Sequence, residues 1–281
     1  MNSSPEWVYV DGSEQAAVSA TDRGLAYGHG LFETMAVVNG QVILAQSHAE
    51  RLKLGCSRLN IHFSAEMEHL LWSELKMLSA RLYSGTLKLI VTAGSAGRGY
   101  AAPRPEPRRI FLGYQSTEYP QSYREDGVAI RTCFYRLPVN EQLAGIKHLN
   151  RLDQVMARRE WMTADWTEGV MLDSKGVVVE GIMTNLFAVI GGDLVTPLVD
   201  RAGVAGVMRC YLLEQAEAIG LSVDQVRLPL EQFFEASEVF ICNSVIGIWP
   251  VRQWDQSMFK LGPVTCRLLD ITDQLFKVKM V

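Results

Sequence analysis

Residues 169–197 read GVMLDSKGVVVEGIMTNLFAVIGGDLVTP. Short apolar runs rich in β-branched residues (GVMLD, VVVEG, NLFAVI and LVTP) are interrupted by the turn sequences SKG and GGD. Runs of this length, bounded by glycine-containing turns, are typical of antiparallel strands. The stretch therefore predicts a β-meander, and with it a second half of the chain organised around a sheet.

Other elements surround this meander in the second half of the chain. Glycine and proline mark two helix boundaries, because Gly220 is a C-terminal stop and Gly262-Pro263 introduces a final helix. The expected elements are a strand over 127–136, a helix over about 151–164, a helix over about 206–219 and a buried strand EVFICNSV at 238–245.

The first half combines a hairpin with helices. Asn39-Gly40 between two apolar runs is a strong hairpin signal. Ser47 and Glu50 have the spacing of a capping box and predict a helix that starts there. The remaining expected elements are residues 7–10 as the first arm of a hairpin before Asp11-Gly12, a helix that buries Leu71, Leu75, Leu78 and Leu82, and strands over 86–93 and 109–115.

The organisation predicted from these elements is α+β with two domains. Residues 1–115 form a smaller N-terminal α/β domain, the polar residues 116–126 a linker, and residues 127–281 a larger C-terminal domain containing the meander. Meanders combined with separate helices favour α+β over a doubly wound parallel sheet.

Composition excludes several classes of protein. A net charge of −4 argues against a general nucleic-acid binder, which needs a basic face. The N-terminus lacks the pattern of a signal peptide, and no apolar run approaches the ~20 residues of a membrane span. Five dispersed cysteines indicate reduced thiols, and the histidines have no metal-ligand spacing with them. The sequence thus predicts a cytoplasmic protein without a metal site.

Lys147 is the first candidate for chemistry. It stands in LAGIKHLNRLDQV, between apolar residues and a segment that turns helical, with Arg151 supplying nearby positive potential. An amine becomes nucleophilic when desolvation or a neighbouring cation suppresses its charge. The ordinary interpretation is a surface lysine at a helix start.

Three further features complement this amine. Glu180 ends an apolar strand, where a buried carboxylate needs a cationic partner such as a protonated pyridine nitrogen. The turn GVAGVMR at 203–209 runs into a helix, whose first N–H groups suit a phosphate, and Ser244 offers a hydroxyl to the same anion. Arg51 lies beside the apolar stripe of its helix and is able to reach inward to a phosphate. Each feature also has an ordinary structural explanation.

Together the order and spacing resemble the class IV aminotransferases, enzymes of pyridoxal 5′-phosphate (PLP) fold type IV. The resemblance runs from DRGLAYGHGLFET through KHLNRL, EGIMTNLF and GVAGVMR to ICNSVIGIWPV. It implies covalent attachment of PLP to Lys147, which also moves protons, and a Glu180 partner for the pyridine nitrogen. It further implies that the phosphate is bound by Arg51, the amides of Val207 and Met208, and Ser244, with Asn185 near the cofactor. A homodimer that acts on a small-molecule substrate is implied as well.

Within the family, GLFET, GSAGRGY and AGIKHLNRLDQV resemble the lyases that act on 4-amino-4-deoxychorismate in folate biosynthesis. This implies that Thr34, Arg98 and Tyr100 face the substrate, with Thr34 as a candidate proton donor. Some positions depart from relatives: Phe32 replaces a tyrosine of D-amino-acid transaminases, and Arg151 stands where branched-chain enzymes have a tyrosine. Ala93 and Met183 are further departures that concern the substrate contacts.

Two alternatives remain open at this stage. A transaminase for D- or branched-chain amino acids would share Lys147, Glu180 and the phosphate ligands, and only the substrate pocket would differ. A non-enzymatic α+β binding protein would make Lys147 incidental. Visible absorbance that is lost on borohydride reduction, with the label on Lys147, separates the enzymes from the binding protein.

Overall fold

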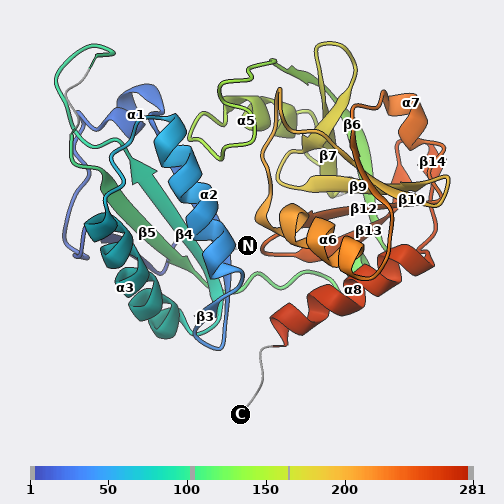
Figure 1. The fold of residues 1–281 in the computed structure, drawn as a ribbon, viewed down its shortest axis with the longest axis horizontal. Coiled ribbons are helices and arrows are strands. Elements are labelled where there is room, and N and C mark those ends of the chain that lie inside the picture. Colours follow the sequence, from blue (N-terminus) through green and yellow to red (C-terminus); the bar gives the residue numbers. More distant parts are fainter. Residues whose placement is uncertain (1–3, 102–104, 164, 278–281) are drawn as a thin grey trace. The chain divides into compact units, whose positions relative to one another are not determined.

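The computed structural model describes residues 4–101, 105–163 and 165–277. The chain divides into two compact units. The first contains the residues up to Glu118 together with the segment Ile146–Asn150, and the second contains Tyr119–Gly145 and Arg151–Lys277. Figure 1 shows the elements of both units.

The first unit is an antiparallel five-stranded sheet in the order β1-β5-β4-β2-β3, with two long helices against it (Figure 1). Side chains alternate between the two faces of a strand. Leu31 and Glu33 of β2 face α2, since a side chain on Gly55 of α2 would meet Leu31 at 2.8 Å and Glu33 bonds to His48. Phe32 and Thr34 therefore lie on the opposite face. The elements are β1 (Trp7–Val10), α1 (Arg23–Tyr27), β2 (Gly30–Val38), β3 (Gln41–Val42), α2 (Ala45–Arg58), α3 (Ala65–Leu82), β4 (Gly85–Thr92) and β5 (Arg108–Tyr114).

Two local predictions for this unit need correction. The helix α2 starts at Ala45, with Leu44 as its N-cap and no side-chain cap, so Ser47 and Glu50 lie inside it and form no capping box. Val10 and Ser13 exchange hydrogen bonds across Asp11-Gly12, but the ladder partner of β1 is β5, so residues 7–10 are not the arm of a long hairpin.

Other predictions for the first unit are confirmed. The turn between β2 and β3 has left-handed backbone at Asn39 and Gly40, with φ of 50° and 75°. Two residues with positive φ define the hairpin turn that Asn-Gly favours. The leucines of α3 that were expected in the core are all buried: Leu71, Leu75, Leu78 and Leu82.

The second unit contains a nine-stranded sheet, whose main path is β11-β10-β9-β12-β13-β6-β7-β8. The expected meander strands all form, but they form two hairpins, β7–β8 and β9–β10, rather than one continuous meander. The strands β12, β13, β6 and β7 stand between β9 and β8. The strands are β6 (Val128–Leu137), β7 (Glu168–Asp173), β8 (Val178–Gly181), β9 (Asn185–Ile190), β10 (Asp193–Pro197), β11 (Val223–Val226), β12 (Glu238–Asn243), β13 (Gly247–Trp254) and β14 (Ser257–Met258).

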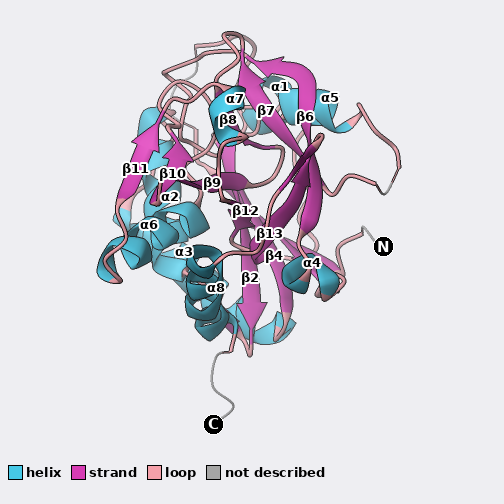
Figure 2. Cartoon of the chain, turned by 90° about the vertical axis from the view of Figure 1, so that its right-hand side faces the viewer, coloured by secondary structure: helices cyan, strands magenta, loops and turns pink. Residues whose placement is uncertain are grey.

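This strand order requires a curled sheet. Only residues 182–184 connect β8 to β9, and a link of that length spans at most about 14 Å. Five strand spacings in a flat sheet would separate the two strands by about 24 Å. The sheet therefore bends back on itself into a half-barrel (Figure 2). One face of it carries a shared core that includes Leu186 and Ile241, whereas the stacked rings of Phe187 and Phe240, with centroids 5.0 Å apart, alternate onto the other face.

The helices of the second unit adjust the remaining boundaries. Helix α5 (Leu152–Arg158) is shorter than the predicted 151–164, of which residue 164 lies outside the described residues. Helices α6 (Val207–Ala218) and α8 (Pro263–Phe276) begin close to the expected positions. The unpredicted helices are α4 (Ser122–Glu125) and α7 (Leu230–Phe233). No helix in the described ranges has the length and hydropathy needed to cross a membrane.

Candidate active site

The backbone of Lys147 is fixed against strand β2 in the first unit. Phe32 N–H donates to the Lys147 carbonyl at 3.0 Å, and Leu149 N–H donates to the Gly30 carbonyl at 3.0 Å. This edge is accessible because β3 pairs only with Val37 and Val38, at the other end of β2. A Cβ at position 30 would lie 2.5 Å from the Val91 carbonyl oxygen, so only glycine allows both neighbours to approach.

A pair of amines flanks the ring of Phe32. The Lys147 Nζ lies 4.4 Å from the ring centroid, and the Lys88 Nζ lies 5.3 Å from it. Thr34 is directly opposite Lys88 on the ladder between β2 and β4. Lys88 is not among the residues predicted for the site, although a lysine within the apolar strand sequence TLKLIVT was a usable signal.

The charge of Lys88 is incompletely solvated. Its partial burial lowers the pKa of the amine below its ordinary value. No carboxylate in the described part of the chain forms an ion pair with it. A half-buried cation of this kind suits an anionic group of a ligand.

Arg51 reaches inward, as the sequence suggested, and there meets a buried carboxylate. Its Nε donates to Glu33 Oε1 at 2.9 Å, and its Nη2 forms an ion pair with Glu33 Oε2. His48 Nδ1 lies 2.6 Å from the same Oε2. The two partners lower the pKa of Glu33 to about 2 despite its burial, while burial lowers the pKa of His48. A neutral His48 that donates from Nδ1 to an ionised Glu33 fits both shifts.

The loop that carries Arg98 and Tyr100 is held by a buried arginine. Arg23, only 5% exposed, donates to the carbonyl oxygens of Gly99 at 3.0 Å and Tyr100 at 2.8 Å. Gly99 N–H donates to the Tyr27 hydroxyl at 3.2 Å. The Arg98 and Tyr100 side chains themselves are exposed.

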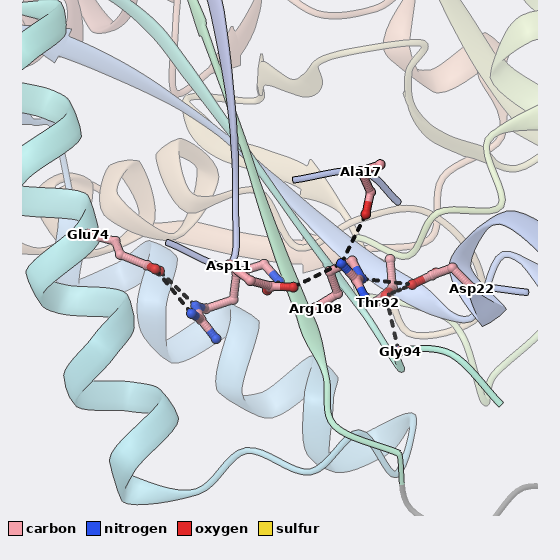
Figure 3. A network of polar contacts seen from close by, with 8 residues as sticks. Asp11, Ala17, Asp22, Glu74, Thr92, Gly94 and Arg108 are labelled. Atoms are coloured by element: carbon pink, nitrogen blue, oxygen red, sulfur yellow. Dashed lines mark hydrogen bonds and ion pairs between the residues drawn. The ribbon is translucent and has the colours of Figure 1, made fainter. Parts of the chain in front are cut away.

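The base of the same loop is fixed by a second network, drawn in Figure 3. Thr92 donates to Asp22 Oδ2 at 2.8 Å and accepts from Gly94 N–H at 3.1 Å. Arg108 forms ion pairs with Asp11 at 3.1 Å and with Asp22 at 3.6 Å. The loop therefore leaves the sheet from a rigid point, although its tip is exposed.

In the second unit, Glu180 and Asn185 both bind one residue, Val204. Glu180 is 4% exposed, and its Oε2 accepts from Val204 N–H at 2.8 Å. Asn185 Nδ2 donates to the Val204 carbonyl at 2.9 Å. Gly203 makes this approach possible, because a Cβ there would stand 3.2 Å from Glu180 Oε2. The two predicted cofactor residues thus position the chain that leads into α6.

The predicted anion site lies at the start of α6. The N-cap Gly206 has no side chain to bond the first N–H groups, those of Val207 and Met208. The Ser244 turn follows β12, where Asn243 Oδ1 accepts from the N–H groups of Val245 and Ile246 at 2.9 Å each. Both features predicted to bind an anion therefore form within one unit, each with a defined backbone conformation.

Arg151 and Arg209 are two arginines of the second unit that lie largely away from solvent. Burial lowers the pKa of the Arg151 guanidinium, while the negative charge of Glu180 acts in the opposite direction, so Arg151 lies within electrostatic reach of that carboxylate. Arg209 is 3% exposed and donates to the Pro197 carbonyl and to Gln225 Oε1, each at 2.9 Å. These contacts assign Arg209 a structural role at the first turn of α6.

No group of three or more metal-ligating side chains gathers anywhere in the described ranges. The five cysteines, all of which the structure describes, form no disulfide. Burial raises the pKa of Cys56, Cys133 and Cys242 to about 12 in each case, which makes these thiols unreactive. The polar groups described above are therefore the candidates for chemistry.

Comparison with known proteins identifies the family. The sequence profile of amino-transferase class IV matches residues 30–254. The chain therefore belongs to the class IV aminotransferase family.

Individual relatives cover almost the whole chain. It is 33% identical to the aminodeoxychorismate lyase of Vibrio harveyi, over 92% of this chain and 97% of that protein. It is 31% identical to a candidate branched-chain-amino-acid aminotransferase of Methanocaldococcus jannaschii, over 93% of each chain. The crystal structure of 4-amino-4-deoxychorismate lyase from Pseudomonas aeruginosa superposes with a TM-score of 0.92 at 46% identity, over 96% of this chain and 99% of that one. The expected fold, PLP fold type IV, is confirmed.

Proposed function

We propose that the protein is a PLP-dependent lyase that converts 4-amino-4-deoxychorismate to 4-aminobenzoate and pyruvate. The observation that carries the proposal is the 46% identity to the Pseudomonas aeruginosa lyase along nearly the full length of both chains. The similarity to the candidate aminotransferase is lower, at 31%. A transaminase of the same family is the second candidate function.

The residues present fit PLP. Glu180 is a buried carboxylate of the kind that a protonated pyridine nitrogen requires, and Gly203 allows its approach to Val204. The first N–H groups of α6 have no side-chain cap, as a phosphate site requires. We assign the phosphate to the amides of Val207 and Met208, with Ser244, and place Asn185 beside the cofactor.

The position of Arg51 extends this assignment. Glu33 engages its Nε and Nη2, which fixes the plane of the guanidinium. We assign Arg51 as a further phosphate ligand, as the resemblance to the family implies, with Glu33 and His48 holding its guanidinium in place.

Bound PLP supplies an electron sink for the carbon whose bond breaks. Lys147 would anchor the cofactor covalently until the substrate's amino group replaces it. The freed Lys147 amine would then take the proton from the carbon that carries the substrate's amino group. Its backbone hydrogen bonds to β2 keep this amine at the Phe32 ring. The Thr34 hydroxyl is assigned as proton donor to the leaving enolpyruvate oxygen. Formation of the aromatic ring makes the elimination strongly favourable.

The substrate has two carboxylates and so needs two cations. Arg98 is the first, on an exposed loop tip whose base is rigid, with Tyr100 beside it. Lys88 is the second, because it is half-buried, lies at the Phe32 ring with Lys147 and has no carboxylate partner in the described part of the chain. The pair of cations matches the two carboxylates of this substrate.

We further propose a cytoplasmic homodimer that serves folate biosynthesis through its product, 4-aminobenzoate. Reduced cysteines support the cytoplasmic location. The dimer is supported by the exposed apolar row Leu152, Val155 and Met156 on α5, whose spacing places the three side chains on one helix face. Equilibrium sedimentation of the purified protein measures the assembly.

One assay tests the proposed activity. The purified protein, loaded with PLP, is incubated with 4-amino-4-deoxychorismate, and 4-aminobenzoate and pyruvate are measured together. Parallel reactions contain D-alanine or L-leucine with 2-oxoglutarate. Equimolar release of the two products from the first substrate is expected. Transamination of either amino acid without release of 4-aminobenzoate would refute the lyase and establish the second candidate.

A further inference from the structure

We infer that Glu168 is a positioning residue for cofactor binding, whose buried carboxylate holds the turn over residues 181–184 and thereby places Glu180 and Asn185. The inference rests on the proposed function, because it concerns the binding of PLP.

The carboxylate of Glu168 gathers three hydrogen-bond donors. Its Oε1 accepts from Gly169 N–H at 2.9 Å. Its Oε2 accepts from Met183 N–H at 3.1 Å and from the Thr184 hydroxyl at 3.0 Å. Glu168 is 2% exposed, and no ion pair in the described part of the chain includes it. Burial raises the pKa of the Glu168 carboxyl, and the hydrogen bonds from Gly169, Met183 and Thr184 act in the opposite direction. A buried carboxylate without a cation depends on such donors, so the turn stabilises its charged form.

The turn is built around this carboxylate. Gly181 N–H donates to the Thr184 carbonyl at 2.8 Å, which closes the turn. A Cβ at position 181 would lie 2.1 Å from the Thr184 hydroxyl and 3.1 Å from Glu168 Oε2. Glycine is therefore required at 181 for the carboxylate and the hydroxyl to meet.

The ends of this turn carry the two predicted cofactor residues. Glu180 comes immediately before it and Asn185 immediately after it, and the two side chains bond the N–H and the carbonyl of Val204. Val204 is three residues from Val207, the first residue of α6. A shift of the turn would thus move the pyridine partner and the phosphate-binding amides together.

The same turn is bonded on its other side to the Ser244 turn. Asn243 Nδ2 donates to the Met183 carbonyl at 3.2 Å, while Asn243 Oδ1 shapes the chain at 245 and 246. Glu168 therefore anchors a connected set of backbone segments that includes every cofactor ligand assigned to the second unit.

A general effect on stability is the competing explanation, and the chain offers a matched control for it. Glu238 is also buried, at 4% exposure. It accepts from Val264 N–H at 3.2 Å, from Thr265 N–H at 2.7 Å and from the Thr265 hydroxyl at 2.7 Å. These are again two amides and a threonine hydroxyl, but they lie at the start of α8.

The experiment compares E168Q with E238Q. PLP dissociation constants are measured by equilibrium dialysis, the visible absorption of the bound cofactor is recorded across pH, and melting temperatures are measured without PLP. The melting temperature should fall by a similar amount in both variants. Only E168Q should bind PLP about tenfold more weakly, with an altered absorption profile, because it loses charge-assisted hydrogen bonds at the turn.

A second pair of variants, T184V and T184S, tests the inference if E168Q does not fold. T184V removes one donor from the carboxylate and should weaken PLP binding about threefold, whereas T184S keeps the hydroxyl and should bind PLP as the wild type does. If E168Q and T184V bind PLP with unchanged affinity and spectrum, the inference is overturned while the proposed function stands. If the wild-type protein takes up no PLP, the proposed function fails and the inference fails with it.

Discussion

The amine of Lys147 lies 4.4 Å from the centroid of the Phe32 ring. The contact joins a residue of the segment Ile146–Asn150 to the beginning of strand β2, and the Phe32 N–H bond to the Lys147 carbonyl reinforces it. The same ring has Lys88 at 5.3 Å. Because both lysines contact the same ring, substitution of one at a time separates the role of Lys147 from that of Lys88.

Lys147→Arg should abolish covalent attachment of PLP and lower turnover by more than about a thousandfold. Arginine keeps the positive charge and the contact with the ring but is not a nucleophilic amine. Lys88→Arg is the matched control and should keep the attached cofactor, with turnover within about tenfold of wild type. Absorbance spectra and steady-state rates of both variants provide the measurement. Attachment that survives in Lys147→Arg would contradict the assignment.

Glu33→Gln should lower the free energy of unfolding by about 3–5 kcal/mol, because it leaves Arg51 and His48 without the charge they share. Urea unfolding of the PLP-free protein measures this. Glu74→Gln is the control, since Glu74 forms a similar pair with Arg109, at 2.7 Å and 3.1 Å, away from the candidate site. Both variants should be destabilised, but only Glu33→Gln should also weaken PLP binding. Equal PLP affinity in the two variants would refute the role of Glu33 in orienting Arg51.

The free energy of unfolding should decrease at acid pH because of the cluster of Glu33, Arg51 and His48. The pKa of Glu33 drops from its ordinary 4.5 to about 2 on folding, so its contribution is complete above pH 4.5 and is lost as the pH falls towards 2. This contribution of Glu33 to the free energy of unfolding is on the order of 3 kcal/mol. The folded pKa of His48 is also lowered, so its contribution declines as the pH falls below 6.5. The stability difference between wild type and Glu33→Gln should shrink between pH 5 and pH 3, and a constant difference would contradict this account.

Glu180→Gln should keep PLP attached to Lys147 and lose most turnover, about a hundredfold or more. The amide preserves the shape of the side chain and an acceptor for Val204 N–H, but it lacks the charge that a protonated pyridine nitrogen needs. Absorbance of the attached cofactor and single-turnover rates separate binding from chemistry. Full activity in Glu180→Gln would show that the carboxylate is misassigned.

Arg98→Gln should raise KM for 4-amino-4-deoxychorismate by about tenfold or more and change kcat much less, since it removes a charge-assisted contact to a substrate carboxylate. Arg159→Gln, another exposed arginine, provides the control for a simple loss of surface charge. Steady-state kinetics at fixed ionic strength measure both. If the two variants show equal KM, Arg98 has no place in substrate binding.

Sequence reasoning succeeded where a local signal determined the structure. The Asn39-Gly40 turn, the leucine stripe of α3 and the start of α8 after Gly262 all follow from short-range chemistry. It failed where pairing is non-local. The separation of β8 from β9 by four intervening strands depends on contacts across the curled sheet, which hydropathy patterns do not encode.

The candidate site shows the same division. Lys147, Glu180 and the start of α6 could be selected because each combines a chemical group with a local backbone signal. Glu33, His48 and Glu168 could not, because their roles appear only when a strand meets a helix or a turn that is distant in the sequence. Lys88 lies between these cases. Its sequence context was unusual for a lysine, but its position at the Phe32 ring requires the register of β2 and β4.

The central claim is that the amine of Lys147 binds PLP covalently. The purified protein is incubated with PLP, reduced with borohydride, digested and mapped by mass spectrometry. The expected result is loss of the visible absorbance band and one modified peptide, which carries the reduced phosphopyridoxyl group on Lys147. A colourless protein, or a label distributed over Lys88 and surface lysines with Lys147 unmodified, would contradict the account.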